Sequence, residues 1–431
     1  MGNKRNAKLA AITPETLIVG IDIAKRVHWA RFIDYRGIEL GRAEKITNDK
    51  QGFENILTTI RQQCNTNSMT KVIIGMEPTG HYWKALACFL KSKGLEIVLI
   101  NPMHTSRIKE VLDNNQSKND QKDAAVIARL VRDGNYYESY LPDDSYADLR
   151  VISAAWATVA KEKSILHNTL TAVLDEYFPE MAQVFKDPIA SKAARQILKT
   201  YPLPAMITEI GIAGIHSEMQ KAVKKTVGIG KARELFQAAE GSIGVTAGAT
   251  ATAVRIQTLI SHLELTEKSQ EQLLVEMKKY LEQTGISEEI LSIPCIGILS
   301  AARLLAEIGD PARFQDHRQL HRLAGYNLVA QSSGEHIGTT KISKRGRATL
   351  RQLLYQTAMI MVAAKNSEAA EMHWYLKARL VNQLTGKQSL VVIAKKILTL
   401  IFYLAKHHQC YEKERFLGEI RKNQIKHLQA A

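Results

Sequence analysis

Short apolar blocks occupy the first third of the chain. Residues 17–24 read LIVGIDIA, and two similar blocks follow, KVIIGME at 71–77 and LEIVLINP at 95–102. Helix-like sequence separates the later blocks, an arrangement typical of buried parallel strands joined by helical crossovers. The polar turn at 34–37, between HWARFID and GIELGRAEKI, predicts a hairpin after the first strand.

The apolar residues then change to helical spacing. They recur at three- and four-residue intervals in QKDAAVIARLVR at 121–132, just before Gly134, and another helix is expected at 53–63. Pro142 ends this region. We therefore predict one α/β domain over residues 15–142.

The rest of the chain is predicted to be all-α. Two stretches, 147–176 and 254–283, contain no Gly or Pro and repeat apolar residues every three or four positions, although Glu267 and Gln270 interrupt the second. They predict two long helices that pair as an antiparallel stalk. The Gly/Ala/Thr-rich segment 241–253 is interpreted as a flexible connection before the second helix.

These patterns divide the all-α part into three predicted segments. They are a long-helix, coiled-coil-like domain at 143–290, a helical C-terminal domain at 291–410 and a basic tail at 411–431. The fold class predicted for the whole chain is thus α/β plus all-α. The apolar run 390–404 is interrupted by two lysines, so it is too short and too charged to cross a membrane and is interpreted as an amphipathic core helix.

The charge balance indicates a polyanionic partner. The 431 residues include 58 Lys and Arg against 43 Asp and Glu, a formal net charge of +15. A basic surface binds nucleic acid through counterion release, although acidic membranes and ribosome-like assemblies attract it too. No long apolar segment follows the basic start of the chain, and the four cysteines are scattered without a CxxC pair. We expect a cytoplasmic protein without a membrane partner.

Four acidic residues lie where the predicted elements would bring them together. Asp22 and Glu77 end two of the apolar blocks, and Asp120 and Asp123 lie three apart at the start of a predicted helix. Singly, an Asp at a helix start is usually a cap. Clustered carboxylates repel one another unless a cation holds them ionised, and Mg²⁺ or Mn²⁺ prefers such oxygen ligands. We therefore predict a metal site, with two ions about 4 Å apart if the chemistry is phosphodiester transfer.

The sequence around these acids resembles a known family. GIDIAK contains Asp22, MEPTGHYW contains Glu77, and INPMHTSRIKE is followed by KNDQKDA with Asp120 and Asp123. These motifs are similar to the signature of the DEDD-type insertion-sequence transposases, which are also described as bridge-RNA-guided recombinases. The resemblance implies an RNase H-like (RuvC-like) N-terminal domain in a prokaryotic, nucleoid-associated protein. It assigns the four acids to metal binding and catalysis.

The resemblance extends to the C-terminal transposase domain. Residues 321–358, HRLAGYNLVAQSSGEHIGTTKISKRGRATLRQLLYQTA, resemble it, which implies that Ser333, directly before Gly334, is the nucleophile that captures a DNA end. Alone, a Ser-Gly pair is usually a turn, and the adjacent Ser332 is the alternative nucleophile. Five basic side chains follow with no acid among them. They are predicted to bind nucleic acid and are Lys341, Lys344, Arg345, Arg347 and Arg351.

An apolar hairpin opens the same domain. LSIPCIGILSAARLLAEIGDPARF at 291–314 predicts a helix, a Gly-containing turn and a second helix. The amides of the turn could bind phosphate, or the turn could simply connect the helices. Cys295 stands where the family commonly has Gly.

The resemblance covers nearly the whole chain and implies excision and insertion of a mobile element. It further implies a structured non-coding guide RNA that pairs with target and donor DNA. A tetramer assembled from dimers is also implied, in which the metal site of one subunit works with the serine of another. Two alternatives stay open: a RuvC-like junction resolvase or nuclease that hydrolyses DNA with water, and a non-catalytic nucleic-acid-binding scaffold.

Overall fold

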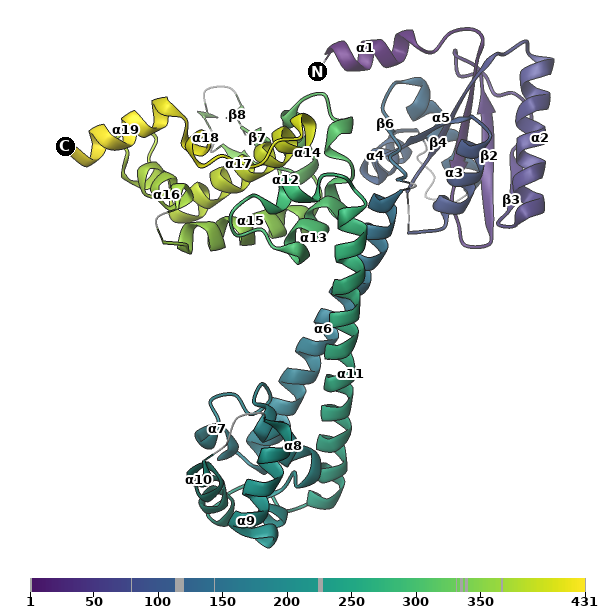
Figure 1. The fold of residues 1–431 in the computed structure, drawn as a ribbon. Coiled ribbons are helices and arrows are strands. Elements are labelled where there is room, and N and C mark those ends of the chain that lie inside the picture. Colours follow the sequence, from purple (N-terminus) through teal and green to yellow (C-terminus); the bar gives the residue numbers. More distant parts are fainter. Residues whose placement is uncertain are drawn as a thin grey trace. The chain divides into compact units, whose positions relative to one another are not determined.

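The chain folds into two compact units. The structure is a computed structural model, and it describes residues 2–78, 80–112, 120–142, 144–223, 228–330, 332–333, 336–337, 340–365 and 367–430. Unit 1 spans Met1–Leu141 and unit 2 spans Pro142–Ala431 (Figure 1). Unit 1 is mixed α/β and unit 2 is mostly helical, which agrees with the predicted fold class.

Unit 1 is built around a six-stranded sheet with the strand order β3-β2-β1-β4-β5-β6. β1, β4 and β5 run parallel to one another, whereas β2, β3 and β6 pair antiparallel with their neighbours. The three predicted parallel strands and the hairpin after the first of them are thereby confirmed. The strands are β1 (Thr16–Asp22), β2 (Val27–Ile33), β3 (Glu44–Thr47), β4 (Lys71–Met76), β5 (Glu96–Leu99) and β6 (Tyr137–Glu138).

Helices cover both faces of this sheet because the side chains of a strand point alternately to either side. In β1, Leu17, Val19 and Ile21 belong to a core that α2 and α3 complete, while Ile18 belongs to the core on the α5 side. The helices of unit 1 are α1 (Gly2–Ala10), α2 (Lys50–Thr66), α3 (Trp83–Ser92), α4 (Pro102–Leu112) and α5 (Asp120–Arg132).

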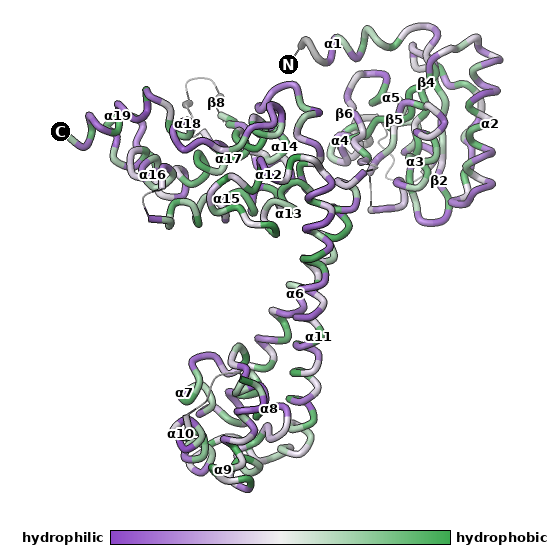
Figure 2. The backbone as a smooth tube through the Cα atoms, viewed as in Figure 1, coloured by the Kyte–Doolittle hydropathy of each residue, from purple (hydrophilic) through white to green (hydrophobic). Residues whose placement is uncertain are grey.

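Two long helices, α6 (Ser145–Tyr177) and α11 (Ala249–Glu282), pack along one another in unit 2, as their sequence period predicts (Figure 1). Hydrophilic and hydrophobic residues alternate along both (Figure 2). The predicted flexible connection at 241–253 is wrong in its second half, because α11 begins at Ala249. Its first half is held by the Glu180 carboxylate, which accepts hydrogen bonds from the Ser242 hydroxyl and the Ile243 amide.

Short helices form one apolar core with the C-terminal end of α6 and the N-terminal half of α11. Phe178, Leu235 and Ile260 are fully or almost fully buried there. Glu267, which interrupts the apolar pattern of α11, accepts charged hydrogen bonds from Arg195 and lies 2.9 Å from the Lys163 ammonium. The short helices are α7 (Met181–Val184), α8 (Lys192–Thr200), α9 (Pro204–Ala222) and α10 (Ile229–Glu240).

The C-terminal helices form the second core of unit 2. Leu149 of α6 and Leu281 of α11 lie within it, so this core includes residues on both sides of position 290. The helices are α12 (Ser287–Leu291), α13 (Ile298–Ile308), the 3₁₀ turn η1 (Pro311–Arg313), α14 (His317–Ala324), α15 (Ala348–Ala363), α16 (Glu368–Ala378), α17 (Gly386–His407), α18 (Lys413–Leu417) and α19 (Glu419–Ala430).

Two C-terminal segments, α17 and residues 411–431, are held in the fold by buried apolar side chains. Among the described residues, α17 is the one helix that is long and apolar enough to cross a membrane, yet Ile393, Ile397 and Ile401 are fully buried in the second core. The segment predicted as a basic tail instead forms α18 and α19. Phe416 and Ile425 anchor these helices because both side chains are almost fully buried.

Candidate active site

Asp22 and Glu77 lie side by side at one edge of the unit 1 sheet. β1 and β4 are parallel neighbours whose last registered pair is Ile21 with Met76. Asp22 is the next residue of β1, and Glu77 directly follows β4. The structure thus places the backbones of these two predicted acids next to one another, at the carboxyl ends of two adjacent strands.

Two glycines bring α5 onto the same part of the sheet. Gly20 and Gly75 are paired in register, each two residues before one of the acids. A Cβ atom on Gly20 would overlap the backbone of Ala124 and Ala128 in α5, and one on Gly75 would overlap the Val131 side chain. The first turn of α5, which carries Asp123, therefore lies against β1 close to the end that carries Asp22.

Sequence reasoning missed the part played by these glycines. The signal was present, since both strands end in the same pattern, with the apolar runs IVGID and IIGME placing Gly two positions before the acid. Glycine in a strand interior weakens the strand unless another backbone must approach closely. Its occurrence at equivalent positions of two neighbouring strands marks the helix contact.

A buried histidine fixes the turn that follows Asp22. The Ala24 amide donates a hydrogen bond to His28 Nδ1 at 3.2 Å, and Asn48 donates to the Lys25 carbonyl at 3.1 Å. His28 has no exposed surface, and this burial lowers its pKa despite the hydrogen bonds that oppose the shift. The ring is therefore neutral at pH 7 and can accept the Ala24 hydrogen bond.

Tyr137 of β6 is a further residue at this edge that the sequence analysis did not single out. It pairs with Leu99 of β5, and Leu99 pairs with Met76, directly before Glu77. Burial raises the pKa of the Tyr137 phenol, and the negative charge of Glu77 raises it further. The phenol is therefore protonated at neutral pH and lies within electrostatic range of one predicted catalytic acid.

The metal site itself is not seen in the described part of the chain. There, no group of three or more His, Cys, Asp or Glu side chains lies close enough together to hold an ion. Asp120 begins α5, but its side chain lies outside the described residues. The chemistry of the donors suits Mg²⁺ or Mn²⁺, since carboxylate oxygens are the ligands these ions prefer. The four-acid site stays a prediction.

The predicted nucleophile lies in a small β-hairpin of unit 2. β8 (Ser332–Ser333) pairs antiparallel with β9 (His336–Ile337), and β7 (Leu328–Val329) pairs with β10 (Lys341–Ile342) on either side of them in sequence. Gly334 and the side chains of both serines lie outside the described residues. The backbone thus holds Ser333 and the alternative Ser332 on one strand.

The base of this hairpin is tightly built. The Ser343 amide donates to the Asn327 carbonyl at 2.8 Å, and the Arg347 amide donates to the Leu323 carbonyl at 2.7 Å. Gly325 has a φ of +73°, and a Cβ atom on Gly346 would press on the backbone at Gly325. The two chain segments that flank the serine strand therefore cross in direct backbone contact.

The five predicted basic contacts differ in their surroundings. Lys341, Lys344 and Arg345 are exposed. Arg347 lies 3.3 Å from the Glu307 carboxylate of α13, and Arg351 donates to the carbonyls of Ala324 and Lys344. Glu307 is remote from this run in the sequence, and folding brings it to Arg347. Arg351 holds the base of the hairpin in the structure.

The turn between α12 and α13 has an unusual backbone. Cys295 is exposed and has a φ of +65°, the left-handed region that favours glycine. Gly297 precedes α13 without a side-chain cap. The residue that departs from the family pattern therefore adopts the conformation that Gly would adopt there.

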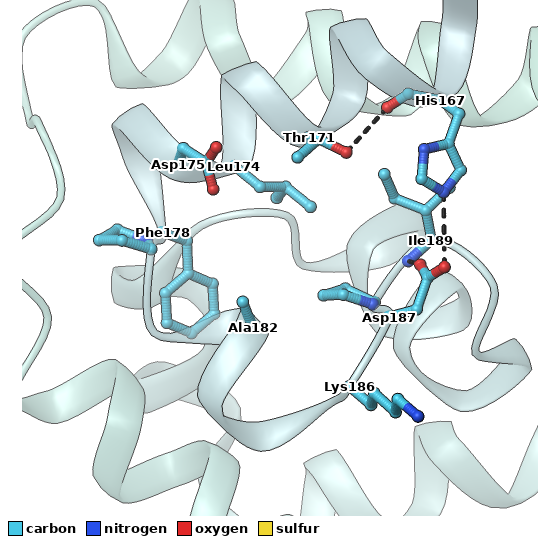
Figure 3. Close-up of a pocket in the computed structure, with 11 residues that line it drawn as sticks. His167, Thr171, Leu174, Asp175, Phe178, Ala182, Lys186, Asp187 and Ile189 are labelled. Carbon is cyan, nitrogen blue, oxygen red and sulfur yellow. Dashed lines mark hydrogen bonds and ion pairs between the residues drawn. The ribbon is translucent and has the colours of Figure 1, made fainter. Parts of the chain in front are cut away.

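A cavity of about 260 Å³ lies beside the C-terminal end of α6 (Figure 3). Residues within 167–189 line it, and none of the predicted site residues is among them. Two of its polar groups are paired with one another, since His167 Nε2 lies 3.5 Å from Asp187, which also accepts hydrogen bonds from the Ile189 and Ala190 amides. The Ala190 hydrogen bond and the nearby His167 hold the pKa of Asp187 below its usual value, against the opposing effect of burial. These contacts stabilise the local fold.

Comparison with known proteins gives matches to both halves of the chain. A family model of IS110-type DEDD enzymes, described as "Transposase", matches residues 19–179. A second model, described as "Transposase IS116/IS110/IS902 family", matches residues 287–373. The two matched regions contain the predicted acids and the predicted serine.

Relatives match over most of their length. The protein named as the transposase of the IS117 mini-circle of Streptomyces coelicolor is 25% identical over 86% of this chain and 92% of its own. The transposase for insertion sequence element IS1111A of Coxiella burnetii is 23% identical over 91% of each chain. The pilin gene-inverting protein of Moraxella bovis is 22% identical over 92% of this chain and 97% of its own.

Proposed function

The chain belongs to the IS116/IS110/IS902 family of DNA transposases, and from this premise we propose that it cuts and exchanges DNA strands at the ends of its own insertion sequence. The reaction is metal-dependent and site-specific and passes through a covalent serine–DNA intermediate. The observation that carries the proposal is the placement of Asp22 and Glu77 at adjacent strand ends.

The proposed fold of unit 1 is RNase H-like, as in RuvC. The strand order supports it, because three antiparallel strands are extended by β4 and β5, which run parallel to β1. In this arrangement the carboxyl ends of the central parallel strands meet at one edge, where ligands of open α/β sheets bind. Asp22 and Glu77 belong to that edge.

The four acids are proposed to bind two Mg²⁺ or Mn²⁺ ions. When bound, such ions stabilise negative charge on the attacking and leaving oxygens of a phosphodiester. Asp22 and Glu77 supply oxygens from the sheet, and Asp120 and Asp123 supply them from the first turn of α5. Gly20 and Gly75 position the helix for this purpose.

Ser333 is proposed to attack the DNA backbone. Its oxygen forms a bond to phosphorus, the bond from phosphorus to one strand breaks, and the departing sugar oxygen takes up a proton. The number of phosphodiester bonds is conserved, so the strand can later be rejoined without an energy source. A serine hydroxyl is a weak nucleophile at its ordinary pKa and needs activation, which the acid site of another subunit is proposed to provide.

The partners proposed are element and target DNA, a non-coding guide RNA and further copies of the chain, in dimers that assemble into a tetramer. The net charge of +15 supports a nucleic-acid partner. Such a protein works in the cytoplasm of a prokaryote, where the nucleoid lies.

The test is the covalent intermediate. Purified protein is incubated with Mg²⁺ and a radiolabelled plasmid fragment that carries the gene and its native flanking DNA, together with RNA transcribed from that flank. Denaturing gels are expected to show a protein–DNA adduct for the wild type and for Ser332→Ala, and none for Ser333→Ala. A Ser333→Ala variant that still cleaves, without any adduct in the wild type, would establish hydrolysis by water instead.

A further inference from the structure

The loop between α16 and α17 (Figure 1) carries two neighbouring apolar side chains in solvent. Leu380 is 93% exposed and Val381 is 74% exposed. Leaving such side chains in water forgoes the stabilisation that burial normally provides. Among the described residues of unit 2, neither side chain belongs to a hydrophobic core.

This loop is held in place on both sides of its tip. The Arg379 guanidinium donates to the Asn382 carbonyl at 2.8 Å, and the Gln383 side chain donates to the Lys377 carbonyl at 2.6 Å. The Leu384 amide returns to the Leu376 carbonyl at 3.0 Å. The tip is therefore presented on a fixed support.

The support is anchored by packing and capping as well. Leu384 packs on the small core of Tyr375, Leu376 and Ile425. Thr385 then caps α17 in a reciprocal hydrogen-bonded box with Gln388. Both helices that flank the loop are thus fixed at the points where the loop leaves them.

Basic residues surround this tip in the sequence. Residues 372–411 contain no Asp or Glu and six Lys or Arg. Lys377 and Lys387 are exposed on the helices that flank the loop. A small apolar tip between cations complements a duplex, since cations contact phosphates while apolar side chains insert between base pairs.

We propose that Leu380 and Val381 form a wedge that inserts at a base step of the bound DNA duplex and unstacks it. The inference rests on the proposed function, in which strands must separate before they are exchanged. The polar side chains of Asn382 and Gln383 directly beside the tip limit the apolar area to two residues, which suits a wedge better than an interface with another protein.

The experiment compares two 30-base-pair duplexes that share one strand. In one duplex the second strand is fully complementary, and in the other it creates two central mismatches. Binding is measured by fluorescence anisotropy for the full-length wild type and the double variant Leu380→Ser, Val381→Ser. Unstacking is largely complete in the mismatched duplex, so the wild type is expected to bind it roughly tenfold more tightly. The double variant is expected to lose this preference and to keep its affinity for the paired duplex within about twofold.

Two further variants serve as controls. Ile243→Ser removes an equally exposed apolar side chain, 86% exposed, from another loop of unit 2 and is expected to keep the preference. Lys377→Gln with Lys387→Gln is expected to weaken binding to both duplexes equally, because phosphate contacts carry no information about pairing. Thermal unfolding shows whether each variant is folded.

The outcomes separate the wedge from the proposed function. Absence of DNA binding by the folded wild type would overturn both. Tight binding by the wild type with equal affinities for the two duplexes, or a preference that the serine variant retains, would overturn the wedge alone. If the double variant Leu380→Ser, Val381→Ser keeps the preference for the mismatched duplex but changes its oligomeric mass in light scattering, the loop is a contact between protein copies.

Discussion

At the scale of residues, the candidate site depends on two glycines as much as on the acids. Gly20 and Gly75 lie opposite one another on neighbouring strands, and α5 rests on both. The acids themselves are tolerated by any strand end, whereas the approach of a helix backbone to a strand requires the absence of a Cβ atom. The position of α5 relative to the acids is therefore set by Gly20 and Gly75, two positions before Asp22 and Glu77.

Replacement of the two glycines by Ala is expected to have unequal effects. Gly20→Ala meets backbone atoms of α5 that cannot move independently, so we expect a loss of stability on the order of 3 kcal/mol. Gly75→Ala meets the Val131 side chain, and Val131→Ala should make room for it. Urea unfolding of the single and double variants tests this. Rescue of Gly20→Ala by Val131→Ala, or no rescue of Gly75→Ala, would contradict the assignment.

Cys295 gives a second prediction for a single residue. Its φ of +65° costs a residue with a side chain about 1 kcal/mol relative to Gly. Cys295→Gly is therefore expected to raise the midpoint of thermal unfolding by a few degrees, whereas Cys295→Ala should leave it unchanged. A variant with Ala that is as stable as the variant with Gly would show that the thiol, rather than the backbone, causes any difference.

At the scale of elements, the long helices could be predicted because their apolar period extends over 30 residues or so. The exceptions to that period could not be interpreted from the sequence. Glu267 lies on the packed side of α11 because Arg195 and Lys163, both distant in sequence, pair with it. The same limit hid the Glu307 partner of Arg347. Ion pairs between residues that are distant in sequence cannot be predicted from the local sequence pattern.

Glu267 predicts a dependence of stability on pH. Burial alone would raise its pKa, but hydrogen bonds from Arg195 and Lys163 outweigh burial and lower it. The ion pairs therefore stabilise the fold above the carboxyl group's ordinary pKa of 4.5, and this stabilisation is lost as the pH falls through the lowered value. Glu267→Gln should lower the free energy of unfolding by about 1–2 kcal/mol at pH 7 and progressively less on acidification. Urea unfolding of the wild type and Glu267→Gln at pH 7 and at acidic pH tests this. A difference in the free energy of unfolding that does not change with pH would contradict the stabilisation by ion pairs.

At the scale of the whole molecule, the α/β character of the first third and the helical character of the rest could be predicted from the sequence. The predicted α/β domain ends at 142, and unit 1 ends at Leu141. The packing of the last helices was not predictable in the same way. The basic residues of 411–431 predict a tail, whereas Phe416 and Ile425 are buried and Leu417 and Leu428 pack beside them. Sparse anchors of this kind do not produce a detectable hydrophobic period.

The basic residues of the serine hairpin should separate into two groups in DNA binding. Lys341→Gln, Lys344→Gln and Arg345→Gln are each expected to reduce the slope of log affinity against log salt by about 1, because each is exposed and free to contact a phosphate. Arg351→Gln should instead lower thermal stability, since its guanidinium supports two backbone carbonyls. Filter binding across a salt series, paired with thermal unfolding, distinguishes the groups. An unchanged melting point for Arg351→Gln would remove its structural role.

The carboxyl ends of β1 and β4 in unit 1 are proposed to direct DNA cleavage with a divalent metal. Cleavage is measured on a plasmid that carries the gene and its flanking DNA, in the presence of RNA transcribed from that flank. The wild type, Glu77→Gln and Glu96→Gln are compared with Mg²⁺ and with chelator. Glu96 begins β5 at the opposite edge and serves as the matched control. We expect cleavage only with Mg²⁺, a loss of at least about a hundredfold for Glu77→Gln, and near-normal activity for Glu96→Gln. Cleavage that persists in chelator, or equal activity of the two variants, would contradict this proposal.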